Sequence, residues 1–245
     1  MCVAALAWQT HPDRLLVVIA NRDEYHERPT APLARWPDDR RTIIAGKDLQ
    51  AGGTWLGVNG GGRLALVTNY RVESYPRPDL ASRGSLVSGW LRDQPPTDGA
   101  TMNPYNLVLV EPGVARLATN YPEAKVCDLA SGVHGVSNGP LASPWAKTER
   151  LCAALVDWLT AGAPSIEPLF IALRDETPLA GPGPEPHLSP VFIRDPVYGT
   201  RCSTVVIVGA DGAGRIVERR FDPSGGKTGE TALDFVWPPF VSSAP

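Results

Sequence analysis

The first 24 residues carry the clearest pattern of apolar and polar positions in the chain. Two apolar runs, 3–8 and 15–20, are separated by the polar stretch 9–14, which contains Pro and Asp. Apolar runs of this length around a polar turn are typical of a β-hairpin. A hairpin centred near residue 12 pairs residues whose numbers sum to about 24, because the turn fixes the register. The pattern therefore predicts that Cys2 lies opposite Arg22.

Further apolar runs predict the remaining elements. Strands are expected at 42–45, 52–58, 63–69, 106–110, 114–119, 134–139, 203–208 and 215–221, several of them joined by Gly-containing turns. Helical spacing of apolar residues predicts helices over 82–91, 144–161 and 166–173, with Ser82 and Ser143 as N-caps. The Pro-rich stretches 25–39 and 177–190 are expected to be loops. Strands at both ends with helices between them predict an α+β layered fold, in one domain over 1–245.

Composition and charge narrow the class of protein. The chain has 245 residues, of which 43% are hydrophobic, enough for a large core. The formal net charge is -3 and no basic run occurs, which argues against nucleic acid or an anionic membrane surface as the main partner. The longest apolar runs have about six residues, too few to span a bilayer. No basic segment precedes the first run, so we expect no signal peptide.

The cysteines give an expectation about the compartment. The sequence has 4 cysteines and no CxxC spacing. This usage indicates a reduced, cytoplasmic protein in which Cys127, Cys152 and Cys202 are buried as small apolar residues. The 4 histidines are scattered without ligand spacing, so we expect no metal site.

The predicted hairpin brings a thiol, a guanidinium and a carboxylate together at one sheet end, from Cys2, Arg22 and Asp23. If Met1 is removed, Cys2 also carries a free α-amine, whose pKa of about 7.7–8.0 lets it take the thiol proton at neutral pH. Arg22 is expected to favour the thiolate and to lower the thiol pKa below its free value of about 8.5. The alternative is a solvated charge cluster of Arg22, Asp23 and Glu24.

Two asparagines and an arginine are expected near the same end of the sheets. The hairpin around the Asn-Gly turn near residue 60 delivers Asn69 and Arg71 to a strand end, and Asn138 follows another short strand. Amide donors from Asn69 and Asn138 would stabilise an oxyanion, each contributing on the order of 3 kcal/mol if well aimed. Capping of local backbone is the alternative reading of both residues.

Ordered blocks along nearly the whole chain carry a family resemblance. They are Met1-Cys2, 21–24, 28–29, 45–49, 52–57, 68–71, 82–84, 137–139, 144–147 and 198–201. In these blocks the chain resembles the NRDE family, which includes the transport and Golgi organisation protein 2 homologues. The resemblance implies a fold similar to the N-terminal nucleophile (Ntn) hydrolases, a four-layer αββα arrangement with two stacked, mostly antiparallel sheets between helical layers.

The resemblance also implies roles for individual residues. Bile-salt hydrolases and penicillin acylases begin with Met-Cys and close their second strand with Asn-x-Asp, a pattern that residues 21–23 fit. Where those enzymes often have an arginine three residues before the Asp, this chain has Ala20. Arg201 resembles an active-site arginine that supports the nucleophile, with pairing to a carboxylate as the alternative. The candidate catalytic residues are Cys2, Arg22, Asp23, Asn69, Asn138 and Arg201, and the candidate binding residues are Asn21, Trp55, Tyr70 and Arg71.

Two classes of function follow. The first is an Ntn-type hydrolase or acyltransferase that uses Cys2 on an amide, ester or thioester bond of a small molecule and needs no cofactor. The second is a non-catalytic intracellular carrier or trafficking protein that uses the same cleft, because eukaryotic relatives are linked to trafficking, lipid handling and haem transport. Its ligand would be haem or a lipid or acyl chain, and Cys or His would hold the haem.

Overall fold

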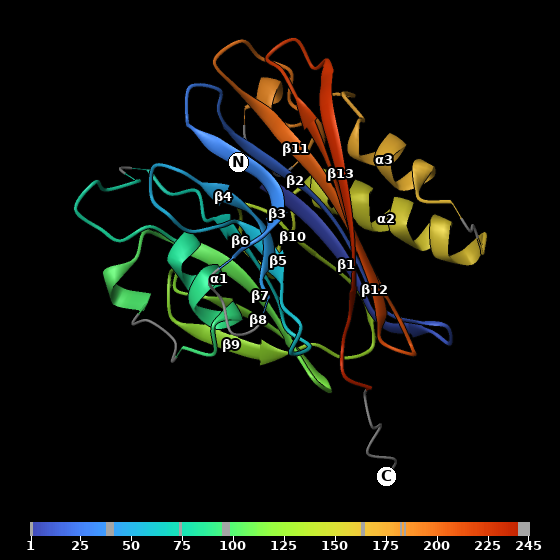
Figure 1. Ribbon diagram of the computed structural model, residues 1–245. Helices are drawn as coiled ribbons and strands as arrows, with labels where there is room; N and C mark the ends of the chain where they lie inside the picture. Colours follow the sequence, from blue (N-terminus) through green and yellow to red (C-terminus); the bar gives the residue numbers. More distant parts are fainter. Residues whose placement is uncertain are drawn as a thin grey trace.

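Two antiparallel sheets stacked face to face form the centre of the protein (Figure 1). The computed structural model describes residues 2–37, 42–73, 75–94, 99–162, 165–181, 183 and 185–239. The first sheet consists of β1 (Cys2–His11), β2 (Arg14–Tyr25), β10 (Gly132–Val136), β11 (Tyr198–Gly209), β12 (Ala213–Phe221) and β13 (Lys227–Val236). Within the described residues its strand order is β10-β1-β2-β11-β12-β13. The ends of the chain therefore share one sheet.

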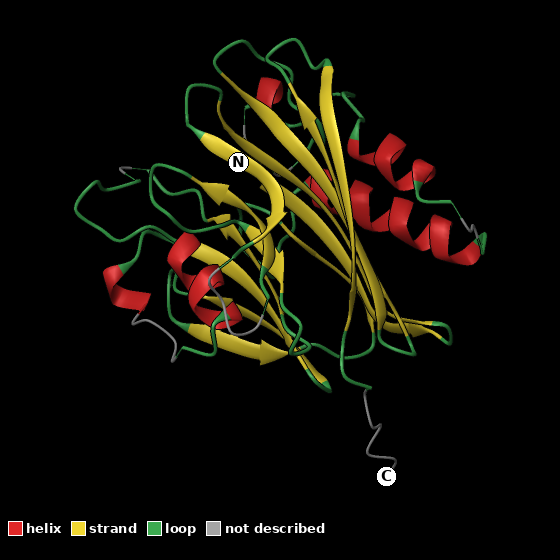
Figure 2. Cartoon of the chain, in the orientation of Figure 1, coloured by secondary structure: helices red, strands yellow, loops and turns green. Residues whose placement is uncertain are grey.

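The second sheet is formed by strands within residues 30–128, the part of the chain between β2 and β10 (Figure 1), and Figure 2 shows its strands as a group beside those of the first sheet. Its strands are β3 (Thr30–Arg35), β4 (Ile44–Asp48), β5 (Leu56–Val58), β6 (Leu64–Asn69), β7 (Tyr105–Glu111), β8 (Val114–Thr119) and β9 (Lys125–Asp128). They lie in sequence order, so neighbours along the chain are neighbours in the sheet. The helices are α1 (Gly84–Leu91), α2 (Ala146–Thr160) and α3 (Glu167–Leu173), with short 3-10 turns η1 (Gly99–Thr101) and η2 (Pro186–Leu188).

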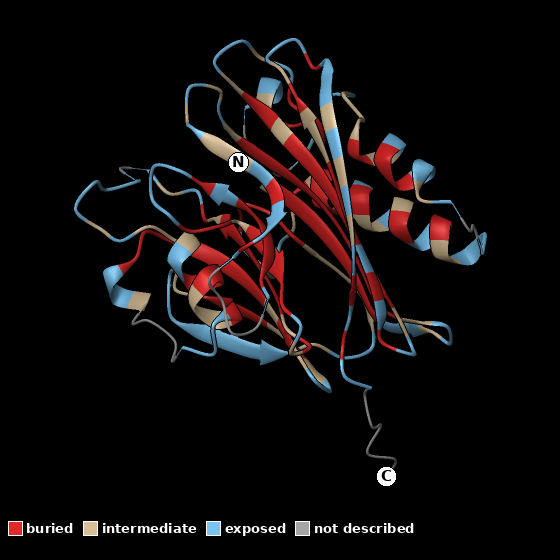
Figure 3. Ribbon diagram, in the orientation of Figure 1, coloured by how far each residue is buried: buried red, intermediate tan, exposed pale blue. Residues whose placement is uncertain are grey.

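Three apolar clusters hold the layers together. One, which includes Leu6 and Val58, lies between the sheets. A second, which includes Ile19 and Leu151, joins the first sheet to α2 and α3. The third joins the second sheet to α1 and includes Val67 and Val87. Figure 3 shows the buried residues concentrated along the inner strands and on the helix faces that meet them. The order of layers is helix, sheet, sheet, helix, which confirms the α+β class and the four-layer αββα arrangement.

The register of the β1–β2 hairpin is the one that the sequence predicts. Cys2 pairs with Arg22, and the antiparallel register continues without a break as far as Trp8 and Leu16. Beyond Trp8 the pairing is irregular, where Gln9 takes a positive φ of 50°. Both strands continue closer to the turn than the apolar runs indicate, because the polar residues still pair through their backbone.

Some expected elements differ from the structure. Residues 25–39 were expected to be a loop but contain β3, and β9 and β13 were not predicted at all; residues 38 and 39 lie outside the described part of the chain. β3 and β13 have mostly exposed or half-buried side chains, so they lack the apolar pattern of a buried strand. The expected N-caps are also wrong. Arg83 and Trp145 occupy the N-cap positions of α1 and α2, and neither gives a side-chain cap bond.

Gly46 permits the close approach of β4 to the Trp55 ring. A Cβ at position 46 would lie 2.3 Å from a ring atom of Trp55. We therefore expect Gly46→Ala to lower the free energy of unfolding by about 1–3 kcal/mol, the cost of overpacking. Gly89→Ala in α1 is the control, because its new methyl meets only a flexible Gln94 oxygen at 3.3 Å. Urea denaturation should show Gly89→Ala equal to or above wild type; a Gly46→Ala curve equal to wild type would contradict the packing argument.

Candidate active site

The main-chain nitrogen of Cys2 donates a hydrogen bond of 2.9 Å to Oδ1 of Asn138. This nitrogen is an amide while Met1 is attached, and it is the α-amine once Met1 has been removed. Met1 itself lies outside the described residues. The Cys2 side chain is half-buried and contributes to the wall of a cavity of about 380 Å³. The first residue of β1 therefore lines the cavity, and its nitrogen is held by Asn138.

Asn138 is completely buried and its side chain bridges the two sheets. Its Nδ2 donates to the backbone oxygen of Asn69 at 2.7 Å, while its Oδ1 accepts from Cys2. Its own backbone oxygen accepts from the Arg71 N–H at 2.7 Å. We expected this amide to donate to an oxyanion. The observed bonds instead direct the amide oxygen at the Cys2 nitrogen and the amide N–H at Asn69.

Side chains of the second sheet fix the segment that carries Asn138. The Thr68 hydroxyl donates to the backbone oxygen of Ser137 at 2.5 Å, and Nδ2 of Asn106 donates to the same oxygen at 3.0 Å. Asn106 also donates to the backbone oxygen of Gly139 at 2.9 Å. These bonds hold the chain between β10 and α2 against β6 and β7. The position of Asn138 thus depends on residues far away in the sequence.

Asn69 ends β6 with its side chain at two neighbouring cavities. It lines the cavity that contains Cys2 and a second one of about 470 Å³, which also reaches Tyr70 and Arg71. Within the described residues its side-chain amide makes no hydrogen bond, in contrast to Asn138. Its N–H groups are consequently open to a ligand in either cavity.

Arg22 lies on the same face of the first sheet as Cys2, because directly paired residues of an antiparallel sheet share a face. Its guanidinium stacks on the Trp55 ring, 4.3 Å from the centroid, and is only 5% exposed. Burial raises the pKa of the Cys2 thiol, and the charge of Asp23 raises it too, while the Asp23 N–H and Arg22 lower it. The expected lowering of the thiol pKa is therefore not found, because burial outweighs the arginine.

Asp23 points to the opposite face of the sheet, toward α2. The Thr200 hydroxyl donates to its Oδ1 at 2.7 Å, and the Tyr198 hydroxyl donates to its backbone oxygen at 2.9 Å. Nζ of Lys147 lies 3.9 Å from Oδ2 of Asp23. Burial raises the pKa of the Asp23 carboxyl, and the charge of Lys147 acts most strongly against that rise. The carboxylate is thus held by β11 and faces one buried cation.

Lys147 and Arg83 were not among the candidate residues. Lys147 is buried and lies one helical turn before Leu151 on the inner face of α2, a position where a lysine is unusual and could have been noticed. Arg83 lines both cavities and donates to the backbone oxygen of Pro104 at 3.1 Å. Burial lowers the pKa of Arg83 to about 10, and the charges of Cys2 and Glu24 oppose this. Arg83 adds positive charge to the cavity wall.

Two candidate residues have structural partners and line neither of these two cavities. Arg201 donates through Nη1 to the backbone oxygens of Tyr25 and Arg28, at 2.7 and 3.1 Å. It therefore ties down the end of β2, and with Arg22 and Trp55 it lines a third cavity of about 130 Å³.

The side chain of Asn21 is also fully engaged in hydrogen bonds within the protein. Its Nδ2 donates to the backbone oxygens of Leu173 and Val191, at 2.8 and 2.9 Å, and its Oδ1 accepts from Ser203. The side chain joins the first sheet to the end of α3, on the face away from Cys2. The expected binding role of Asn21 gives way to this role in packing.

The other candidates lie at the cavities. Trp55 lines the Cys2 cavity, and Tyr70 and Arg71 line the neighbouring one. The other three cysteines are expected to be buried, and the structure confirms this for Cys202 alone. Cys152 is half-buried, and Cys127 is exposed on the edge strand β9. Burial raises the pKa of Cys152 to about 11 and that of Cys202 well above its ordinary value.

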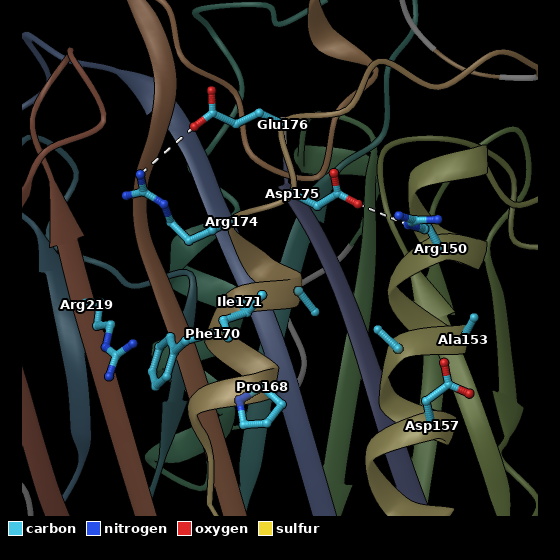
Figure 4. Close-up of a pocket in the computed structure, with 12 residues that line it drawn as sticks. Arg150, Ala153, Asp157, Pro168, Phe170, Ile171, Arg174, Asp175, Glu176 and Arg219 are labelled. Carbon is cyan, nitrogen blue, oxygen red and sulfur yellow. Dashed lines mark hydrogen bonds and ion pairs between the residues drawn. The ribbon is translucent and has the colours of Figure 1, made fainter.

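A larger cavity of about 800 Å³ lies on the outer side of α2 and α3, away from Cys2 (Figure 4). Several of its charged residues pair with one another, as in the contacts of Arg150 with Asp175 and of Arg174 with Glu176. Among the described residues, no serine, threonine, cysteine or lysine lines it. In the part of the chain that the structure describes, no three His, Cys, Asp or Glu side chains gather as a metal site. No described helix is both long and apolar enough to cross a bilayer.

Solved structures with a similar fold include two variants of the conjugated bile acid hydrolase from Clostridium perfringens. The first variant has alanine in place of a cysteine at position 2; it is 9% identical, with a TM-score of 0.56, and the match covers 96% of this chain and 92% of that one. The second is 10% identical, with a TM-score of 0.53, over 94% and 92% of the two chains. At this identity the similarity shows the fold alone, which is that of the Ntn hydrolases.

Sequence comparison identifies the family. The homologue of Transport and Golgi organization protein 2 from Bos taurus is 31% identical over 238 residues, covering 83% of this chain and 86% of the relative. The Homo sapiens homologue is 31% identical over 245 residues, with the same coverage. The family model described as Transport and Golgi organisation 2 matches residues 1–223. The chain therefore belongs to the Transport and Golgi organisation 2 family.

Proposed function

We propose that this protein is an Ntn-type hydrolase or acyltransferase in which Cys2 attacks an amide, ester or thioester bond of a small molecule. One observation carries the proposal: the Cys2 nitrogen is fixed by Asn138 at 2.9 Å, and Cys2 and Asn69 line the same cavity. A nucleophile, a base and an unoccupied amide donor thus meet at one place, which is the arrangement that covalent catalysis requires.

The α-amine is the proposed base. Once Met1 is removed, the neutral amine takes the thiol proton, and Sγ of Cys2 attacks the substrate carbonyl carbon. The tetrahedral adduct collapses, the bond to the leaving nitrogen, oxygen or sulfur breaks, and the ammonium returns the proton to the leaving group. Water, or an acceptor in a transferase, then cleaves the thioester on Cys2 with the same amine as base. None of these steps needs a cofactor.

The surrounding residues assist different steps. Asn138 orients the amine through its Oδ1, and Arg22, on the face of Cys2, favours the thiolate against the effect of burial. Asn69 has its side-chain amide free to donate to the oxyanion within the described residues, at a site also lined by Cys2. A thiol with a raised pKa makes little thiolate unaided, so the proposal depends on the amine.

The likeness in fold to the conjugated bile acid hydrolase supports a hydrolase without identifying the bond that is cleaved. The same cleft would serve the alternative, a carrier that binds haem, a lipid or an acyl ligand without reacting. The two functions differ in one respect: only the enzyme forms a covalent acyl intermediate on Cys2.

We expect p-nitrophenyl acetate to acylate Cys2 in the chain that lacks Met1. Intact mass should rise by one acetyl group, and peptide mapping should place it on Cys2. Cys152 and Cys202 should stay unmodified near neutral pH, since burial raises the pKa of both thiols. The exposed Cys127 is the one competing thiol that solvent reaches freely, so Cys127→Ser serves as the background.

In that background, Cys2→Ala should abolish acylation, whereas Cys152→Ala should leave its rate unchanged. Ligand binding without any adduct on Cys2, across amide, ester and thioester probes, would support the carrier and contradict the enzyme.

Asn69→Ala should slow acylation of Cys2 by about 10²–10³-fold, the usual effect of removing an oxyanion donor. Alkylation by iodoacetamide forms no oxyanion, so the rate of Cys2 alkylation should stay close to that of wild type. The ratio of the two rates, measured by mass spectrometry on the same samples, separates transition-state stabilisation from a general disturbance of the site. Equal losses in both reactions would show that Asn69 has only a structural part.

A further inference from the structure

A buried lysine lies against the carboxylate next to the proposed nucleophile. Lys147 is the second residue of α2, its side chain is 1% exposed, and its Nζ is 3.9 Å from Oδ2 of Asp23. Nζ has no hydrogen-bond partner among the described residues. The nearest ring is that of Trp145, whose centroid is 5.9 Å away. The ammonium group therefore has one close ionic neighbour, and that neighbour is Asp23.

Packing alone does not account for this lysine. A buried ammonium group without hydrogen bonds is unfavourable, and an apolar side chain at the same place on α2 would join Leu151 in the core without that cost. What a lysine adds at this position is a positive charge beside Asp23. Burial lowers the pKa of the Lys147 ammonium, and the charge of Arg71 after β6 adds to this, while the charges of Asp23 on β2 and Cys2 on β1 act against it and favour the charged form.

The contact of Lys147 at the Cys2 site is its ion pair with Asp23, while the charges of Lys147 and Cys2 interact over a longer distance. The Lys147 side chain lines neither of the two cavities near Cys2, and Asp23 points to the face of the sheet that α2 covers. The carboxylate follows Arg22, the partner of Cys2 in the register, so its charge acts on Cys2 at short range. Such a carboxylate favours a protonated amine on Cys2.

We propose that Lys147 is a positioning residue that keeps the Asp23 carboxylate charged, so that Asp23 stabilises the ammonium formed when the α-amine of Cys2 takes the thiol proton. The inference rests on the proposed function of Cys2. The proton moves from Sγ to the amine and later to the leaving group, and neither Asp23 nor Lys147 exchanges a proton. Lys147 offsets the burial that otherwise favours the neutral carboxyl of Asp23.

The experiment measures the charge of Asp23 and the reactivity of Cys2 separately. In the Met1-free wild type, the ¹³C signal of the Asp23 carboxyl, assigned through its backbone, should report a carboxylate from pH 6 to pH 8. Lys147→Met should raise the midpoint of that signal by about 2 pH units or more. The same variant should slow acylation of Cys2 by p-nitrophenyl acetate at least about tenfold at neutral pH, the effect of one pKa unit.

Two further variants separate charge from packing. Lys147→Arg retains the positive charge and should leave the Asp23 midpoint at the wild-type pH. If Lys147 only filled space, the midpoint would not depend on whether the residue at position 147 is charged. Lys125→Met removes an exposed lysine from β9 and should change neither readout. The wild-type spectrum needs no variant to fold, so it decides the first half of the proposal even if Lys147→Met is unstable.

The possible failures are distinguishable. A protonated Asp23 at pH 7 in the wild type, or the same midpoint in wild type and Lys147→Met, would overturn the role of Lys147. So would loss of thermal stability in Lys147→Met with an unchanged pH profile of acylation, since this is the result of a purely structural pair. A wild-type Cys2 that no acyl probe modifies would instead refute the proposed function, and the carboxyl signal would still report the charge of Asp23.

Discussion

The arrangement of the site depends on the register of one hairpin. Side chains along a strand alternate between the two faces, so pairing Cys2 with Arg22 places both at the interface between the sheets and directs Asp23 toward α2. A slip of one residue would exchange these faces. Thiol and guanidinium would then meet the helices, and the carboxylate would meet the second sheet. The apolar residues 3–8 and 15–20, packed on both faces, hold the register in place.

The second sheet and α2 supply the other residues that position the Cys2 site. Asn138 binds the nitrogen of Cys2 only because Thr68 and Asn106 hold its segment against β6 and β7. Lys147 reaches Asp23 from the first turn of α2, which begins eight residues after Asn138. The Cys2 site is therefore assembled across all the layers, with burial acting against thiolate and carboxylate alike. The Asp23 N–H and Arg22 act against that effect at the thiol, and Lys147 and Thr200 act against it at the carboxyl.

The sequence predicts the β1–β2 register, the main hairpins and the layered class, because long apolar runs around short turns leave few alternatives. β3 and β13 carry no such pattern and could not be predicted. The sequence shows which residue types the site contains, but the role of each residue depends on contacts with residues far away in the chain. Asn138 accepts a hydrogen bond from Cys2 through its side-chain oxygen, and Arg201 donates to two backbone oxygens. Both arrangements exist only once the sheets and loops have packed together. Lys147 followed the helical spacing of the buried face, but only the structure places it against Asp23.

The central claim is that the α-amine of Cys2 is the base for its own thiol. The most direct test is the pH dependence of Cys2 alkylation by iodoacetamide in two chains, one beginning at Cys2 and one with an uncleaved residue before it. Intact mass confirms which chain is present. The account predicts that the free-amine chain reacts faster near neutral pH, with a lower midpoint, because in the blocked chain burial raises the thiol pKa and no amine takes the proton. Identical profiles for the two chains would contradict it.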